Sequence, residues 1–290
     1  MTVGQAYRRI LANCLGHLRG NRGAVANSDD IEAVHQMRVA GRRLRAALAL
    51  FEPPDGGMAA ELSEEVRWLA LCLGNARDWD VFVTETWPWL VPAGTAGSEP
   101  LFRLAQERQA AARLAARKAV RSRRYRALIN RLEAWIADEG SLGEPSETLP
   151  RLSRLGDHSG KLLAKRLRRV LRRAGKPDKL TENRRHALRI SAKKLRYTAE
   201  FLSSLYPTTS VRPYLKQLSA VQDDLGVLND GAVTHRLLGE LAGAAATADS
   251  AALTQMGAAN ARRTKMQLRS LKKNWRRFEQ TTPFWESKKD

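Results

Sequence analysis

The chain contains the stretch His35-Gln36-Met37-Arg38-Val39-Ala40-Gly41-Arg42-Arg43-Leu44-Arg45 and repeats its pattern as His186-Ala187-Leu188-Arg189-Ile190-Ser191-Ala192-Lys193-Lys194-Leu195-Arg196. The histidine, the basic positions and the apolar positions recur 151 residues later. A second repeat follows, in which Leu73-Gly74 precedes Asp78 and Leu225-Gly226 precedes Asp230, 152 residues apart. A chain of 290 residues has room for two similar halves. We therefore expect two copies of one structural unit, each contributing a positively charged helix to a common site.

Each stretch has the periodicity of an amphipathic helix, in which successive residues lie about 100° apart. In the first copy, one side collects basic residues and the opposite side collects apolar ones. The basic side holds His35, Arg38, Arg42 and Arg45, and the apolar side holds Met37, Leu44, Leu48 and Phe51. In the second copy the basic side holds His186, Arg189, Lys193 and Arg196, and the apolar side holds Leu188, Leu195, Ala199 and Leu202. Arg43 and Lys194 lie to one side of these stripes.

The basic sides differ from an ordinary solvated helix face, which is the simpler interpretation. A solvated helix usually mixes signs and gains from Glu–Lys pairs at i,i+4. Here no acid lies between Glu32 and Glu52, or between Glu182 and Glu200. Like charges at these spacings repel, and a bound anion would offset the repulsion. We therefore expect an anionic ligand, with the two histidines contacting it rather than acting as phosphoacceptors.

The composition indicates polyanionic partners. The chain has 50 Lys and Arg residues against 30 Asp and Glu residues, a formal charge of +20. The surplus is uneven, with 20 basic and 17 acidic residues in 1–145 and 30 and 13 in 146–290. Such a charge favours nucleic acid, anionic lipid or polyphosphate. The isolated Cys14 and Cys72 fit a reducing cytoplasm, and no apolar run is long enough to predict a membrane span.

The pattern predicts an all-α protein, because apolar residues recur at spacings of three and four throughout. We expect halves 1–145 and 146–290, joined by a short linker over residues 140–146. The predicted helices are 3–20, 29–51, 57–74, 77–90, 99–120, 122–139, 151–175, 180–204, 211–226, 228–243 and 247–280.

Other charged residues could extend or support the site. A further basic stripe is expected on residues 151–175, at Lys161, Lys165, Arg168 and Arg172. Less specific basic clusters are Arg121, Arg123, Arg124 and Arg126, and Arg262, Arg263, Lys265, Arg269, Lys272, Lys273 and Arg276. The acids at Asp78, Asp80 and Asp230 are too few for a two-metal centre, so we expect them to hold arginines of the stripes, with Asp223 and Asp224 at the surface. No catalytic residue, metal site or cofactor is predicted.

These residues resemble the CHAD family, the conserved histidine α-helical domain. The resemblance rests on the two stretches that begin with a histidine and on the second repeat that follows each of them. It also rests on Ser122-Arg123-Arg124-Tyr125 and on Pro283-Phe284-Trp285. It implies two pseudo-symmetric four-helix-bundle-like halves around a basic central groove or pore. The site residues then include Tyr197 beside the two stripes.

The resemblance also implies a non-catalytic binding module for inorganic polyphosphate, found in the cytoplasm at polyphosphate granules with other granule proteins. Some relatives carry a triphosphate-tunnel domain first, but no Glu-x-Glu-x-Lys motif lies near the start of this chain, so triphosphatase activity is not expected. The alternative is a basic helical protein whose ligand is nucleic acid. Weak binding of nucleic acid is also expected if the ligand is polyphosphate. A third possibility is a polyphosphate-processing enzyme.

Overall fold

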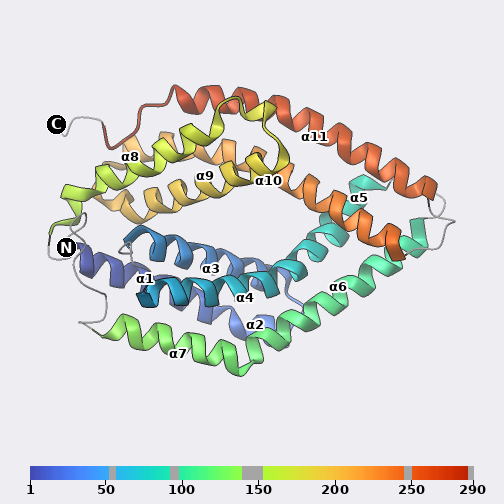
Figure 1. Cartoon of the computed structure of the whole chain (residues 1–290), viewed down its shortest axis with the longest axis horizontal. Coiled ribbons are helices and arrows are strands. Elements are labelled where there is room, and N and C mark those ends of the chain that lie inside the picture. Colours follow the sequence, from blue (N-terminus) through green and yellow to red (C-terminus); the bar gives the residue numbers. More distant parts are fainter. Residues whose placement is uncertain (52–56, 92–97, 139–152, 245–249, 287–290) are drawn as a thin grey trace. The chain divides into compact units, whose positions relative to one another are not determined.

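The computed structural model describes residues 1–51, 57–91, 98–138, 153–244 and 250–286, and the expected linker over residues 140–146 lies outside them. Apart from one isolated bridge between Thr2 and Arg154, the described residues form helices and connecting segments (Figure 1). The helices are α1 (Val3–Gly20), α2 (Arg22–Asn27), α3 (Ile31–Phe51), α4 (Gly57–Val81), α5 (Trp87–Leu90), α6 (Ser98–Arg121), α7 (Arg123–Ala137), α8 (Leu155–Ala174), α9 (Glu182–Leu202), α10 (Thr208–Ala244) and α11 (Ser250–Glu279), with short turns η1 (Phe82–Thr86), η2 (Pro177–Lys179) and η3 (Ser203–Leu205). The predicted all-α class is confirmed.

The chain divides into two compact units. The first unit comprises Met1–Val83 and Gln106–His158, and the second comprises Thr84–Ala105 and Ser159–Asp290. The first unit therefore holds α1 to α4, α7 and the C-terminal part of α6. The second holds α5, the N-terminal part of α6, most of α8, and α9 to α11. The segment from residue 84 to residue 105 thus belongs with the C-terminal helices.

In the first unit, α3 packs along both α1 and α4, and α7 packs on α1 and α4 (Figure 1). The core between these helices is apolar, and Leu11, Met37 and Leu62 are fully buried in it. Tyr7 of α1 meets Trp135 of α7 edge to face, with ring centroids 6.0 Å apart. Burial of such side chains contributes about 1.5–3 kcal/mol each. Packing against both neighbours therefore holds α3 in place.

In the second unit, the long helix α10 packs along α9 and α11 (Figure 1). Tyr214 at the start of α10 is buried against Phe278 and Phe284, at centroid distances of 5.6 and 5.5 Å. Leu195 of α9 and Leu271 of α11 are fully buried. The second unit thus builds its core on the two sides of α10.

The predicted helix breaks near Gly74 and near Gly226 are wrong. One helix, α4, spans the first position, and one helix, α10, spans the second. Neither glycine has a positive φ, so neither terminates a helix in the usual left-handed conformation. A glycine inside a helix costs about 1 kcal/mol relative to alanine, and both helices continue through their glycine despite that cost.

None of the described helices is both long and apolar enough to span a membrane. In the same described ranges, no group of three His, Cys, Asp or Glu side chains could hold a metal ion.

Candidate functional site

The predicted division of α3 into two faces is confirmed. Met37, Leu44 and Leu48 are fully buried, whereas His35 and Arg38 on the other side are half-buried. The basic residues therefore line a partly covered surface of the first unit rather than its core. We define the α3 basic face as His35, Arg38 and Arg42.

The electrostatic surroundings of His35 are positive. Burial lowers the pKa of His35, and the guanidinium groups of Arg77, Arg42 and Arg38 lower it further. The carboxylate of Glu32 acts in the opposite direction. Three arginines therefore influence His35 against one acid. An imidazole with a lowered pKa is held neutral, and it still has one N–H to donate.

Gly74 accounts for the position of Arg38. A Cβ atom added to Gly74 would lie 2.6 Å from Nη1 of Arg38. The glycine on α4 therefore leaves the space through which the α3 guanidinium passes. The equivalent glycine of the second unit differs, because a Cβ atom at Gly226 would meet no atom within 4 Å.

Two of the predicted first-unit residues have other surroundings. Arg45 has its Nε 3.5 Å from Oγ of Ser63, and burial lowers its pKa, as does Arg67. Arg43 influences Cys14 of α1, whose pKa is raised to about 11 by burial and lowered in part by Arg43. These two arginines act on α4 and α1 rather than on His35. The Nε atom of Arg42 is buried, and in the part of the chain that the structure describes it has no hydrogen-bond partner.

The α9 basic face, which we define as His186, Arg189 and Lys193, repeats this division in the second unit. Leu188 and Leu195 on the opposite side are fully buried, as predicted. Arg189 and Lys193 are half-buried, and His186 is exposed. The second repeated stretch therefore also separates a core side from a basic side.

His186 contacts Asn229 of α10. Its Nδ1 lies 3.0 Å from Oδ1 of Asn229, and Nδ2 of Asn229 donates to Oδ1 of Asp230 at 3.5 Å. In the repeat, Asn229 occupies the place of Arg77. The two histidines are thus accompanied by different residues, an arginine in the first unit and an amide in the second. Asp230 was expected to hold an arginine, but its hydrogen bond is to Asn229.

A pocket of about 260 Å³ lies beside His186. Glu182 and Arg185 from the first turn of α9 line it together with Leu228 and Arg236 of α10. The pocket therefore combines an apolar wall with charges of both signs.

The remaining predicted residues of α9 are less available to a ligand. Arg196 pairs with Glu200, with Nε 2.7 Å from Oε1, and its Nη1 lies 3.4 Å from Oε1 of Gln222. Gln222 in turn donates from Nε2 to the carbonyl oxygen of Ala192 at 2.7 Å. Arg196 is thereby held along its own helix and toward α10. Lys194 and Tyr197 are half-buried on α9.

The predicted stripe on α8 is exposed. Among the described residues, Lys161, Lys165, Arg168 and Arg172 form no ion pair. A neighbouring residue that the sequence did not single out, Arg173, attaches α8 to α9. Its Nη1 donates to the carbonyl oxygen of Ala187 at 3.1 Å and to Oγ of Ser191.

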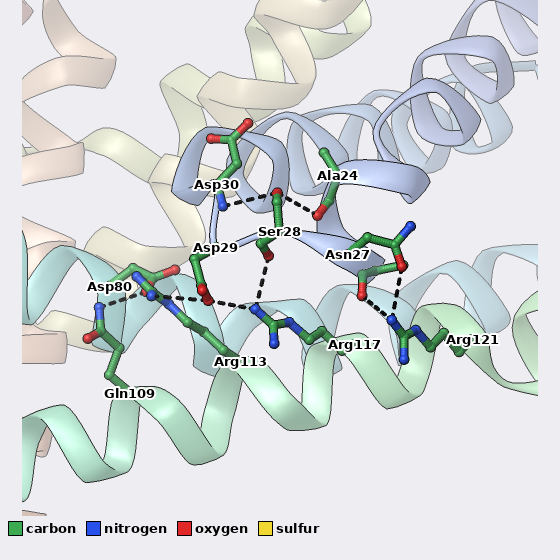
Figure 2. Close-up of polar contacts among 11 residues, drawn as sticks. Ala24, Asn27, Ser28, Asp29, Asp30, Asp80, Gln109, Arg113, Arg117 and Arg121 are labelled. Carbon is green, nitrogen blue, oxygen red and sulfur yellow. Dashed lines mark hydrogen bonds and ion pairs between the residues drawn. The ribbon is translucent and has the colours of Figure 1, made fainter.

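An arginine ladder on α6 holds the start of α3, and the sequence did not indicate it (Figure 2). Arg117 donates from Nη2 to Oδ1 of Asp29 at 2.6 Å and to the carbonyl oxygen of Ser28 at 3.1 Å. Four residues further along α6, Nη2 of Arg121 donates to the carbonyl oxygen of Ala26 at 2.6 Å. The ladder thus fixes the segment from which α3 begins. In the sequence, the i,i+4 spacing of Arg113, Arg117 and Arg121 was the one sign that these arginines share a side of α6.

The same ladder contains a buried carboxylate. Asp80 of α4 is fully buried and accepts hydrogen bonds at Oδ1 from Nε of Arg113 at 2.6 Å and from Nε2 of Gln109 at 2.9 Å (Figure 2). The sequence predicted that Asp80 holds an arginine of the basic stripes. The arginine that binds Oδ1 of Asp80 is Arg113, which lies on α6 and not on the basic stripes.

Arg124 of α7 is structural as well. It binds Glu65 through two hydrogen bonds, Nε to Oε2 at 2.7 Å and Nη2 to Oε1 at 2.9 Å. Its guanidinium also lies 4.3 Å from the ring centroid of Trp68. Together with Arg121, this places two members of the expected basic cluster in contacts within the first unit.

The chain is similar to proteins whose structures are known. A family model described as the CHAD domain matches residues 9–239. The crystal structure of the CHAD domain from the plant Ricinus communis is 34% identical, with a TM-score of 0.80, over 95% of this chain and 92% of that one. PptA from Streptomyces chartreusis is 15% identical with a TM-score of 0.74, over 95% of this chain and 100% of that one, which is a likeness of fold alone.

One curated relative is an uncharacterized protein of Mycobacterium tuberculosis. It is 29% identical over 227 residues, which are 76% of this chain and 42% of that protein. The chain therefore spans less than half the length of this relative.

Proposed function

Because the chain belongs to the CHAD domain family, we propose that it binds inorganic polyphosphate through the α3 and α9 basic faces, without catalysing a reaction. A linear polymer with a charge on every phosphate suits rows of cations along helices. Guanidinium groups bind pairs of phosphate oxygens with two parallel hydrogen bonds. The exposed stripe on α8 extends the cationic surface of the second unit.

The surroundings of His35 carry the proposal. Three guanidinium groups, those of Arg77, Arg42 and Arg38, act on this imidazole against the single carboxylate of Glu32. Charges in a partly buried place interact more strongly than charges in bulk water. Several cations gathered in such a place therefore interact strongly with a polyanion. A phosphate polymer supplies negative charge along its length, at one charge per phosphate.

A charge-matched pair of variants tests this function. The first variant changes Arg38, Arg42, Arg189 and Lys193 to Ala. The control changes Arg103, Arg108, Lys118 and Arg126 to Ala, which are exposed on α6 and α7. We expect the first variant to lose at least a hundredfold in polyphosphate affinity, since a single hydrogen bond to a charged group contributes about 1.5–3 kcal/mol and four cations are removed. The control should bind like the parent protein.

Calorimetric titration gives the affinities, and circular dichroism follows helicity and melting. An unfolded first variant would assign the basic faces a structural role instead. Equal losses of affinity in the two variants would show that binding depends on net charge alone, and would overturn the proposed site.

Competition separates this function from nucleic acid binding. Long-chain polyphosphate should displace labelled RNA or DNA at equal phosphate concentration, and a clear preference for nucleic acid would contradict the proposal. Incubation with polyphosphate and Mg²⁺ or Mn²⁺ tests the non-catalytic character, because sustained phosphate release would contradict it. In cells, we expect a fluorescent fusion to collect at polyphosphate granules.

A further inference from the structure

The outer side of α11 carries a second row of cations. Between Ser250 and Phe278 this helix has no acidic residue. Its exposed basic residues are Arg262, Lys265, Arg269, Lys272, Lys273, Arg276 and Arg277. Leu271, Trp275 and Phe278 on the other side are buried in the core of the second unit.

The spacing places these cations in one line. Arg262, Lys265, Arg269, Lys272 and Arg276, which we call the α11 basic face, follow one another at intervals of three and four residues. Residues at such intervals are neighbours on one side of a helix. At 1.5 Å per residue the row extends over about 21 Å.

Most of this face has no acidic partner. Lys272 lies 3.9 Å from Asp178 of η2, and Arg263, beside the face, is held with its guanidinium 4.2 Å from the ring centroid of Trp89. Within the described ranges, Arg262, Lys265, Arg269 and Arg276 form no ion pair. Like charges at i,i+3 and i,i+4 repel one another. An anionic ligand along the row would remove that cost.

The first unit provides an internal comparison. The arginines of α6 and α7 also recur along helices, but Arg113, Arg117, Arg124 and Arg131 each have a carboxylate partner in the same unit. Those arginines are used to hold helices together. Apart from Lys272, the cations of the α11 basic face have no such partner among the described residues, so a row of them on one line fits an external anionic partner.

The helices α9 and α11 pack against different sides of α10. Gln222 and Asn229 of α10 contact α9, whereas Asp224 and Gly231 contact α11. Gln222 and Asn229 share one side of α10, because seven residues complete nearly two turns. Asp224 is about 200° around the helix from Gln222, which is almost the opposite side. A ligand on α9 therefore does not occupy the place of a ligand on α11.

We propose that the α11 basic face is a second polyphosphate site, so that the second unit binds two chain segments and links separate polymer chains. This inference rests on the proposed function for the α9 face. Phosphate polymers suit α11 better than single-stranded nucleic acid does, because Trp275 and Phe278 are buried and offer no surface on which bases could stack. Among the described residues of α11, the exposed large hydrophobic side chain is Met266, at 63%.

The test compares two variants of equal charge. The α11 variant changes Arg262, Lys265, Arg269 and Arg276 to Gln. The control changes Arg103, Arg108, Lys118 and Arg126 to Gln. Calorimetry with a short polyphosphate of defined length counts the chains bound per protein, and light scattering with a long polyphosphate follows the linking of chains.

We expect the α11 variant to bind one short chain fewer than the control and to lose the rise in scattering. If the α11 variant equals the control in both measurements, α11 is not a polyphosphate site, although the proposed function stands. If the parent protein binds no polyphosphate, the proposed function itself fails. A duplex DNA titration is run in parallel: loss of DNA binding with an unchanged number of polyphosphate chains would assign α11 to nucleic acid and overturn the inference.

Discussion

Arg38 of α3 lies across Gly74 of α4, so closely that a Cβ atom on the glycine would stand 2.6 Å from Nη1 of the arginine. Alanine at residue 74 would force the guanidinium to move. We expect Gly74→Ala to weaken polyphosphate binding about tenfold, because the loss of one charge-assisted hydrogen bond costs about 1.5 kcal/mol. The free energy of unfolding should change little, since alanine favours the helix by about 1 kcal/mol and offsets the crowding.

Gly226→Ala is the matched control, because a Cβ atom there meets nothing within 4 Å. This variant should gain up to about 1 kcal/mol of stability from helix propensity and keep its affinity. Urea unfolding and calorimetric titration measure both quantities. Equal affinities for the two alanine variants would show that the contact between Arg38 and Gly74 has no part in binding.

Removal of the arginine beside Asp80 should be strongly destabilising. The Asp80 side chain is fully buried and pairs with Arg113 at 2.6 Å, so Arg113→Ala removes the arginine partner of a buried carboxylate and keeps the hydrogen bond from Gln109. We expect a loss of about 3 kcal/mol in the free energy of unfolding. Arg67→Ala is the comparison, because Arg67 and Glu64 are both largely exposed and such pairs contribute less than about 1 kcal/mol. Similar losses in urea unfolding would contradict the assigned role of Asp80.

Cys14 should make stability depend on alkaline pH. Burial raises its pKa to about 11, whereas a thiol in an unfolded chain has a pKa of about 8.5. The folded state therefore holds the proton more tightly, and this contribution is complete below about pH 8.5 and is lost as the pH rises toward 11. A shift of this size corresponds to about 3 kcal/mol.

Cys14→Ala removes this contribution, so the fall in unfolding free energy between about pH 8 and pH 10.5 should be smaller in the variant than in the parent protein. Urea unfolding at the two pH values measures the difference. Cys72→Ala is the control at a half-exposed thiol, whose pKa is also raised by burial. If Cys14→Ala keeps the full pH dependence, the thiol is not its source.

The residue beside each histidine should set the affinity of its unit. Arg77 acts on His35, whereas Asn229 lies 3.0 Å from His186 at the equivalent position of the repeat. We expect Asn229→Arg to raise polyphosphate affinity about fivefold and Arg77→Asn to lower it by a similar factor, since one added cation contributes on the order of 1 kcal/mol. Titration at a fixed salt concentration measures both. Asn229→Leu removes the contact with His186 without adding charge, and an increase in that variant would show that charge is not the cause.

The sequence predicted what depends on local periodicity. The core and basic sides of α3 and α9 follow from the angular positions of Met37 and Arg38, or of Leu188 and Arg189, and the structure confirms them. The resemblance to the CHAD family rested on these same stretches, and the family model that matches residues 9–239 confirms it. Such patterns need no knowledge of which helices pack together.

Contacts between distant residues could not be predicted in this way. Asp224 was expected at the surface, but it is buried and accepts a hydrogen bond from Nδ2 of Asn274 at 2.8 Å, 50 residues further along the chain. Arg121 was placed in a basic cluster, but it binds Ala26 and Asn27 at the end of α2. The partner of a polar residue depends on the tertiary fold, whereas the angle of a residue around its helix does not.

The hydrogen bonds of the arginine ladder also affect the order in which contacts form while the chain is being synthesised. Arg117 binds Asp29 across 88 residues of sequence, and Arg121 binds Ala26 across 95. A chain leaves the ribosome from its N-terminus, and contacts between distant residues form late. The helices that carry His35 and Arg77 therefore emerge well before the arginines that secure the start of α3. A nascent chain paused between α4 and α6 would expose the α3 basic face on a helix whose start is not yet held by the arginines of α6.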